Sequence, residues 1–186
     1  MRPRPAQQGP ETGSNGAGRD RDDSGRPRNA RPRDRLGRPL ARDSQGDPAG
    51  PQPATAGSAL SPEQAVRTAQ RLLDEGRPFH AHEVFEDSWR SAPPAERDLW
   101  QGLAQLAVGL THALRGNAAG AVALLRRGAD RLAGYSGAAV HDIDLAEVVG
   151  SARQLAGRIE QDGLAAIPPA ALSLPLRGEP GGDQVR

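Results

Sequence analysis

One short segment holds most of the side chains that could do chemistry. It reads Phe79-His80-Ala81-His82-Glu83-Val84-Phe85-Glu86-Asp87-Ser88-Trp89. In a helix of about 100° per residue, His82 and Glu86 lie one turn apart, on the same arc as Phe85 and Trp89. Because a carboxylate is rarely buried unless it is paired, we expect this His82–Glu86 pair to be a buried polar feature facing the core. His80 points the other way and is interpreted as a surface residue.

A second polar stripe occurs in the charge-free segment 99–114. An apolar ridge runs along one side of it: Leu99, Leu103, Leu106, Leu110 and Leu114. On the other side Gln101, Gln105 and His112 align within about 40° of arc. Gly102 and Gly109 flank this polar stripe and predict the close approach of another helix. Buried amides and imidazoles need partners, which the preceding helix could offer.

The first hypothesis for these side chains is structural. A buried hydrogen-bond network would fix the packing of two helices. Its members would be His82, Glu83 and Glu86 on one helix and Gln101, Gln105 and His112 on the other.

The second hypothesis is a metal-dependent enzyme. His82-Glu83-x-x-Glu86 is similar to the helical zinc motif H-E-x-x-H with glutamate in place of the second histidine. His82 and Glu86 would then be metal ligands, His112 a third ligand, and Glu83 the general base.

The third hypothesis is a groove for a protein or small-molecule partner, with Phe79, Phe85 and Trp89 as its anchors. The chain has no phosphate-binding glycine loop and no serine with a histidine and an acid at a recognisable spacing. We therefore favour a non-catalytic interaction or ligand-binding module. In this hypothesis the polar cluster is structural, no catalytic residue is assigned and no cofactor is predicted.

The elements that position these residues are helices, and no segment alternates as a strand does. Capping residues, prolines and glycines predict an all-α, antiparallel bundle of about five helices with a long central third helix. The five expected helices begin after Ser61, at Pro78, near Ala95, after Asn117 and after Asp142 or Asp144. They end at Gly76, Arg90, Arg115, Gly134 and Gly163. Residues 164–176 are expected to run across the bundle as an extended apolar chain.

Residues 1–58 differ in composition from the rest of the chain. They hold 11 arginines against seven acids, and Leu36 and Leu40 are their only large aliphatic residues after Met1. Such a segment buries too little apolar surface to offset its ordering entropy. We therefore expect a disordered tail over 1–58, a helical domain over 59–176 and a disordered C-terminus over 177–186. Nucleic-acid association through Arg26–Arg33 is a further alternative, which the interleaved aspartates and the lack of stacking aromatics disfavour.

The fixed spacing of several unusual residues is similar to that of the family known as domain of unknown function 309. The residues that carry this resemblance are His82-Glu83-x-x-Glu86-x-x-Trp89, Gln101-Gly102-Leu103, Gly116-Asn117 and Gly120-Ala121. It covers about residues 70–135. The resemblance implies a small helical bundle of the kind found in mostly prokaryotic proteins, and it supplies no reaction.

Composition narrows the classes of function that remain open. The formal net charge is +1, so the whole molecule has no strong field toward nucleic acid or membranes. The absence of cysteine excludes disulfides, thiolate zinc sites and cysteine nucleophiles. The N-terminal residues lack the apolar stretch of a secretory signal, so we expect a cytoplasmic protein. The charge-free segment 99–114 is too short and too polar to span a bilayer.

Overall fold

The computed structural model describes residues 32–41, 43–46, 60–135 and 141–177. Within these ranges the chain forms five α-helices and no strand, as the sequence predicts. They are α1 (Pro62–Asp74), α2 (Pro78–Ser91), α3 (Arg97–Leu114), α4 (Ala118–Leu132) and α5 (Leu145–Asp162). Short 3-10 turns lie beside them at Pro94–Glu96, Ala133–Tyr135, Leu164–Ala166 and Pro169–Ala171. None of the described helices is long and apolar enough to cross a membrane.

The helix ends lie where the local sequence places them. Ser61 and Gln64 form a reciprocal capping box at the start of α1, which satisfies two backbone N–H groups that have no helical partner. Asn117 accepts a hydrogen bond from the Gly120 amide and so caps α4. Of the two aspartates proposed for α5, Asp144 is the cap, and its side chain accepts from the Glu147 amide.

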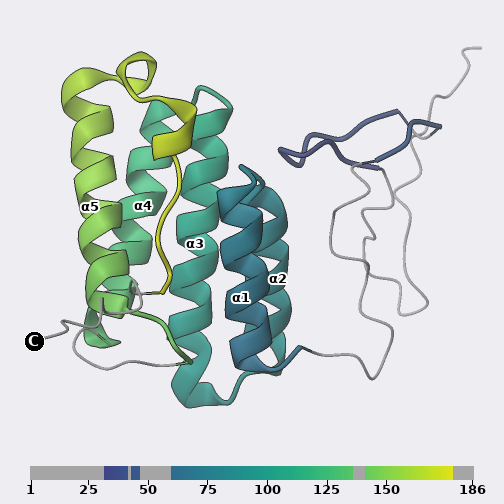
Figure 1. Ribbon diagram of the computed structural model, residues 1–186, viewed down its shortest axis with the longest axis vertical. Coiled ribbons are helices and arrows are strands. Elements are labelled where there is room, and N and C mark those ends of the chain that lie inside the picture. The colour runs from purple at the N-terminus through teal and green to yellow at the C-terminus, as the bar shows by residue number, and fades with distance from the viewer. Residues whose placement is uncertain (1–31, 42, 47–59, 136–140, 178–186) are drawn as a thin grey trace, which may run out of the picture. The chain divides into compact units, whose positions relative to one another are not determined.

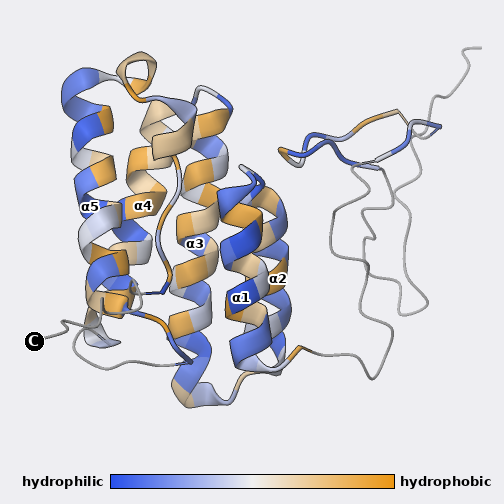
Figure 2. Cartoon of the chain, in the orientation of Figure 1, coloured by the Kyte–Doolittle hydropathy of each residue, from blue (hydrophilic) through white to orange (hydrophobic). Residues whose placement is uncertain are grey.

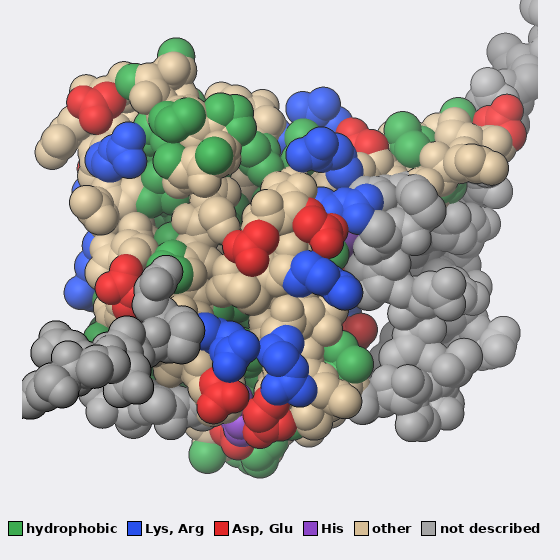
Figure 3. Space-filling model, viewed as in Figure 1, with side chains coloured by type: hydrophobic (Ala, Val, Ile, Leu, Met, Phe, Trp, Pro, Cys, Tyr) green, Lys and Arg blue, Asp and Glu red, His purple; other side chains and the backbone are tan. Residues whose placement is uncertain are grey.

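The third helix is central, as predicted. It packs against α2 on one side and α4 on the other, while α1 covers α2 and α5 covers α4 (Figure 1). The apolar residues face inward between neighbouring helices and the outer faces are polar (Figure 2). Eleven residues of α3 are buried, which is why this helix carries no charge in its interior. On the face of the bundle shown in Figure 3, arginine and acidic side chains are interspersed.

The helices α3 and α4 are in close contact because glycines line their interface. A Cβ atom at Gly102 would lie 2.7 Å from Cγ of Leu132, and one at Gly128 would lie 2.9 Å from the carbonyl oxygen of Gly102. At Gly109 the corresponding neighbour is Leu125, at 3.0 Å. The predicted close approach is confirmed, and the approaching helix is α4.

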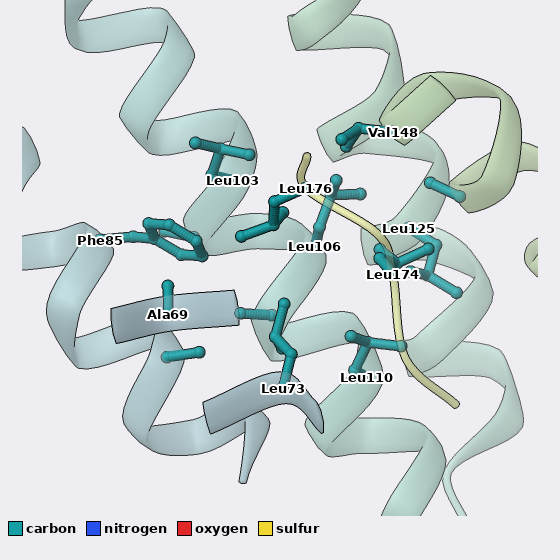
Figure 4. Packing of buried hydrophobic residues seen from close by; sticks show 14 of the residues in the cluster. Ala69, Leu73, Phe85, Leu103, Leu106, Leu110, Leu125, Val148, Leu174 and Leu176 are labelled. Carbon is teal, nitrogen blue, oxygen red and sulfur yellow. The ribbon is translucent and has the colours of Figure 1, made fainter. Parts of the chain in front are cut away.

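The chain after α5 returns across the bundle, as expected. Leu174 and Leu176 point into the core between α3 and α4, beside Leu106 and Leu125 (Figure 4). The side chain of Gln70 in α1 pairs with this segment, since its Oε1 accepts from the Leu176 amide at 2.6 Å. The carbonyl of Leu176 in turn accepts from the Asp144 amide at 3.0 Å. These two bonds satisfy backbone groups of Leu176 that no sheet pairs.

The structure differs from the sequence prediction within the tail assigned to residues 1–58. Residues 32–41 form a tight turn in which Leu40 N–H donates to the carbonyl of Pro32 at 2.8 Å. Arg33 and Pro39 form an isolated antiparallel bridge. This segment contains the two leucines, Leu36 and Leu40, that distinguish it from the rest of the tail. The remaining residues of the tail, apart from 43–46, and 178–186 at the C-terminus lie outside the described residues, as do residues 26–31 of the proposed nucleic-acid segment.

Candidate functional site

The buried face of α2 shares only Phe85 with the arc that the sequence predicted. Val84 and Phe85 are buried, and so is His80, which was expected at the surface and is 3 % exposed. Trp89, expected to face the core, is 38 % exposed, and the Glu86 side chain is 42 % exposed. The prediction was wrong for His80, Glu86 and Trp89, because it chose the arc from the aromatics and the ionisable pair. The buried residues of α2 are Pro78, His80, Ala81, Val84 and Phe85.

The His82–Glu86 pair forms within α2, at its partly exposed edge. His82 Nε2 lies 3.3 Å from Glu86 Oε1, and the second carboxylate oxygen, Oε2, accepts from Arg90 at 3.1 Å. Burial lowers the pKa of His82, while the neighbouring carboxylate opposes that shift. A neutral imidazole that donates from Nε2 leaves Nδ1 as an acceptor, and Nδ1 is buried without a hydrogen-bond partner.

Glu83 lies one residue beyond His82 and is partly buried. Burial raises its pKa to about 7, with smaller contributions of the same sign from Asp87 and Glu86. The Arg33 guanidinium acts in the opposite direction and lowers the pKa. Glu83 therefore changes its charge near neutral pH.

The polar side chains of α3 do not pair with those of α2. His112 Nδ1 lies 2.8 Å from the Asn117 side-chain nitrogen, Nδ2, at the turn before α4. Gln105 Oε1 is buried and has no hydrogen-bond partner. Among the described residues no hydrogen bond joins the predicted cluster across the two helices, so the proposed α2–α3 network is not formed.

The residues considered as metal ligands are likewise not gathered together. Within the described ranges no group of three or more histidine, cysteine, aspartate or glutamate side chains could hold a metal ion. His82, Glu86 and His112 therefore do not make the three-ligand site of the metalloenzyme hypothesis. The reason is positional, because Glu86 lies one turn beyond His82 and bonds to Arg90, while His112 bonds to the next turn of chain.

The structure does bring His82 and His112 to a common cavity. It has a volume of about 430 Å³, within the usual range for small-molecule sites. Three elements line it: α2, the C-terminal half of α3 with the residue that follows it, and the turn at residues 33–39. Its lining residues are Arg33, Gly37, Arg38, Pro39, Phe79, His82, Val108, Thr111, His112 and Arg115. Three arginines and two histidines are thus part of the lining, which includes no acidic residue.

The three aromatic residues expected as anchors lie in three different environments. Phe79 lines the cavity, and the Arg33 guanidinium lies over its ring at 5.3 Å from the centroid. Phe85 belongs to the core, 1 % exposed, with its ring centroid 6.4 Å from that of Trp100. Trp89 lies outside the cavity lining. Of the three, only Phe79 therefore remains as a candidate anchor for a ligand.

Sequence reasoning missed most of the α3 side of this cavity. Val108, His112 and Arg115 follow one another at helical spacing, so the pattern was present in the sequence. The contribution of residues 33–39 had no such signal, since it depends on contacts between segments about 40 and 80 residues apart.

A second polar cluster was also missed. His141 Nε2 lies 2.9 Å from Glu96 Oε2, and His141 Nδ1 lies 3.4 Å from Glu63 Oε1. The imidazole stacks on Trp100, with ring centroids 5.7 Å apart and planes at 22°. This cluster joins the start of α1, the start of α3 and the loop before α5. In the sequence, His141 lies between the expected fourth and fifth helices and has no motif around it.

Comparison with known proteins indicates a family and supplies no activity. A stretch of 48 residues aligns at 46 % identity with the uncharacterized protein YpuF of Bacillus subtilis (strain 168). The alignment covers 25 % of this chain and 28 % of that protein. No solved structure matches the chain significantly. Residues 66–124, which include α2, α3 and the start of α4, match the family described as a domain of unknown function (DUF309), and this confirms the resemblance that the motif spacing predicted.

Proposed function

We propose that this protein is a non-catalytic binding module, and that the cavity between α2, α3 and residues 33–39 takes a small anionic ligand. The ligand class is a molecule that carries a phosphate or a carboxylate group. The observation that carries the proposal is the composition of the lining. Arg33, Arg38 and Arg115 supply three positive charges, and the lining includes no acidic side chain. Glu83, which is outside the lining, interacts electrostatically with Arg33. The bundle face in Figure 3, by contrast, mixes basic and acidic side chains.

Arginine is suited to this role for a geometric reason. Its planar guanidinium presents five N–H donors, and two of them can bond both oxygens of a carboxylate or phosphate. Arg115 uses one nitrogen for the carbonyl of Leu36, which leaves other donors for a ligand. Phe79 and Val108 add an apolar wall, as is typical of small-molecule sites.

The two histidines of the lining add ring nitrogens that can form hydrogen bonds. A neutral His82 has one ring nitrogen committed to Glu86 and the other without a hydrogen-bond partner. His112, a lining residue, contacts Asn117 through its Nδ1, so Nε2 is the ring nitrogen that remains for a ligand. The lining includes no serine or cysteine, and its one hydroxyl, that of Thr111, donates to the carbonyl of Ala107 at 2.9 Å. This supports binding in preference to nucleophilic catalysis. A chain without cysteine is compatible with the cytoplasm, which we propose as its compartment.

The proposal is tested by titrating the full chain with inorganic pyrophosphate and, separately, with citrate in a calorimeter. We expect saturable binding of one of the two, weakened by added salt because the contacts are ionic. The two probes separate a phosphate ligand from a carboxylate ligand.

Two variants locate the site. Arg115→Gln removes one lining charge and is expected to weaken binding by about tenfold, the value of one charge-assisted hydrogen bond. Arg127→Gln changes an exposed arginine on α4 outside the cavity and should leave binding unchanged. Absence of binding by the wild-type chain, or equal binding by both variants, would exclude the proposed site.

A further inference from the structure

Residues 33–39 form a turn that is organised by its own side chains. Asp34 Oδ1 accepts from the amides of Leu36 at 2.9 Å and Arg38 at 2.8 Å. The Gly37 amide donates to the carbonyl of Asp34 at 2.8 Å, and Arg33 Nη1 donates to the carbonyl of Gly37 at 2.6 Å. One aspartate side chain thus satisfies two amides, as is usual for this residue in turns.

The turn meets the helical domain at an aromatic ring. Gly37 is buried, and a Cβ atom at this position would lie 2.2 Å from Cδ2 of Phe79. Its φ of +77° is also a conformation that residues with a side chain rarely adopt. Two requirements, one steric and one conformational, therefore select glycine at position 37.

Two arginines hold the turn, one from the turn itself and one from the helical domain. The guanidinium of Arg33, which belongs to the turn, lies over the Phe79 ring. The guanidinium of Arg115, which follows the end of α3, donates through Nη2 to the carbonyl of Leu36. Neither Phe79 nor Arg115 is part of the buried core, so the turn can leave without exposing that core.

We infer that residues 33–39 are a clasp that docks on Phe79 and Arg115 and determines the affinity and access of the anion site. The inference rests on the proposed function. In the docked state the clasp contributes Arg33 and Arg38, two of the three arginines of the cavity, and covers one side of it. Ligand exchange then requires the clasp to undock, and a bound anion holds it in place by bridging Arg115 to the arginines of the clasp.

Docking of the clasp can be measured without any ligand. In the full chain we expect nuclear Overhauser effects between the Gly37 Hα protons and the Phe79 ring. Asp34→Ala should weaken them without loss of helical content, since it removes the acceptor of two turn amides and lies outside the helices. Absence of these effects in the wild-type chain overturns the clasp, whether or not an anion binds.

The effect of the clasp on binding is measured with Gly37→Val in a titration with inorganic pyrophosphate. Valine cannot occupy the space against Phe79, so we expect at least about tenfold weaker binding and faster dissociation as two guanidinium groups leave the site. Asp34→Ala, which loosens the turn without a steric clash, should weaken binding in the same direction. The matched control is Gly163→Ala, because Gly163 has the same φ of +77° but no atom within 4 Å of its Cβ position.

The outcomes separate the two proposals. If Gly37→Val shows no Overhauser effect between position 37 and Phe79 but keeps wild-type affinity, the clasp is overturned and the anion site stands. No binding of pyrophosphate or citrate by the wild-type chain overturns the anion site, while the Overhauser effects still decide whether the clasp exists. Equal weakening by Gly37→Val and Gly163→Ala would assign the effect to backbone strain and reject the clasp.

Discussion

His82 Nε2 and Glu86 Oε1 lie 3.3 Å apart on successive turns of α2, so both members of this pair belong to the same helix. Glu86 also accepts from Arg90, one turn further on, and its side chain is 42 % exposed. The pair is therefore part of an ordinary ladder of i, i+4 contacts at a helix edge, and its energetic value is that of partly exposed ion pairs.

Replacement of Glu86 by alanine should consequently have a small effect. We expect Glu86→Ala to lower the free energy of unfolding by less than about 1 kcal/mol, because the carboxylate and Arg90 remain accessible to water. Urea denaturation at pH 7 measures the change. Glu75→Ala is the control, since Glu75 is similarly exposed and also pairs with arginine. A loss of about 3–5 kcal/mol would instead indicate that Glu86 belongs to a buried charged network.

Glu83 should make stability depend on pH. Burial raises the pKa of this carboxyl from 4.5 to about 7 in the folded protein, so the folded state binds the proton more tightly than the unfolded state does. The stabilisation of the folded state that comes from this tighter proton binding is fully present below about pH 4.5. It is lost as the pH rises through 7. Glu83 is only half buried, so solvent screening reduces the full shift to an effect of about 1–2 kcal/mol.

The test is Glu83→Gln, which keeps the shape and removes the titration. The variant should match the wild type near pH 5 and exceed its stability near pH 8, as followed by denaturation midpoints at intermediate values. Asp74→Asn provides a control at an exposed carboxyl. A wild-type profile that rises between pH 5 and 8 relative to Glu83→Gln contradicts the raised pKa.

One methyl group added at the interface of α3 and α4 should destabilise the protein. A Cβ atom at Gly128 would lie 2.7 Å from Leu106 Cδ2 and 2.9 Å from the carbonyl oxygen of Gly102. Because a carbonyl in a helix cannot move away cheaply, we expect Gly128→Ala to destabilise by about 1–3 kcal/mol. Thermal melting measures the loss.

Gly157→Ala is the matched control, because Gly157 lies within α5 and has no atom within 4 Å of its Cβ position. It should stabilise by about 0.5–1 kcal/mol through helix propensity alone. If both variants stabilise the protein, the close approach of the two helices is not as described.

His141 and Glu96 should be energetically coupled. Their contact at 2.9 Å is largely shielded from solvent, and Glu96 Oε2 also accepts from the Trp100 indole at 3.3 Å. A double-mutant cycle of His141→Ala and Glu96→Gln should give a coupling of about 1 kcal/mol. The near-ultraviolet circular dichroism of Trp100 should change in both single variants. A coupling near zero would show that the loop before α5 is not held by this contact.

The local sequence by itself determined the helices and their ends. Ser61, Asn117, Asp144 and Gly163 lie at helix boundaries because capping is a matter of a few neighbouring backbone groups, which are close in sequence. The central position of α3 was equally predictable, since a long segment without charge must be covered on most sides. The spacing of the motif in α2 and α3 was sufficient to indicate the family that residues 66–124 match.

Only the tertiary structure decided which face of α2 is buried and where the site lies. The orientation of α2 depends on its two neighbours, α1 and α3. Ala81, Val84 and Phe85 are buried, while Trp89, the other aromatic of the sequence pattern, is exposed. The cavity depends on Gly37 meeting Phe79 and on Arg115 reaching Leu36, contacts between segments distant in the chain. Such contacts leave no periodic signal, because they result from the packing of whole elements and not from the spacing of residues within one.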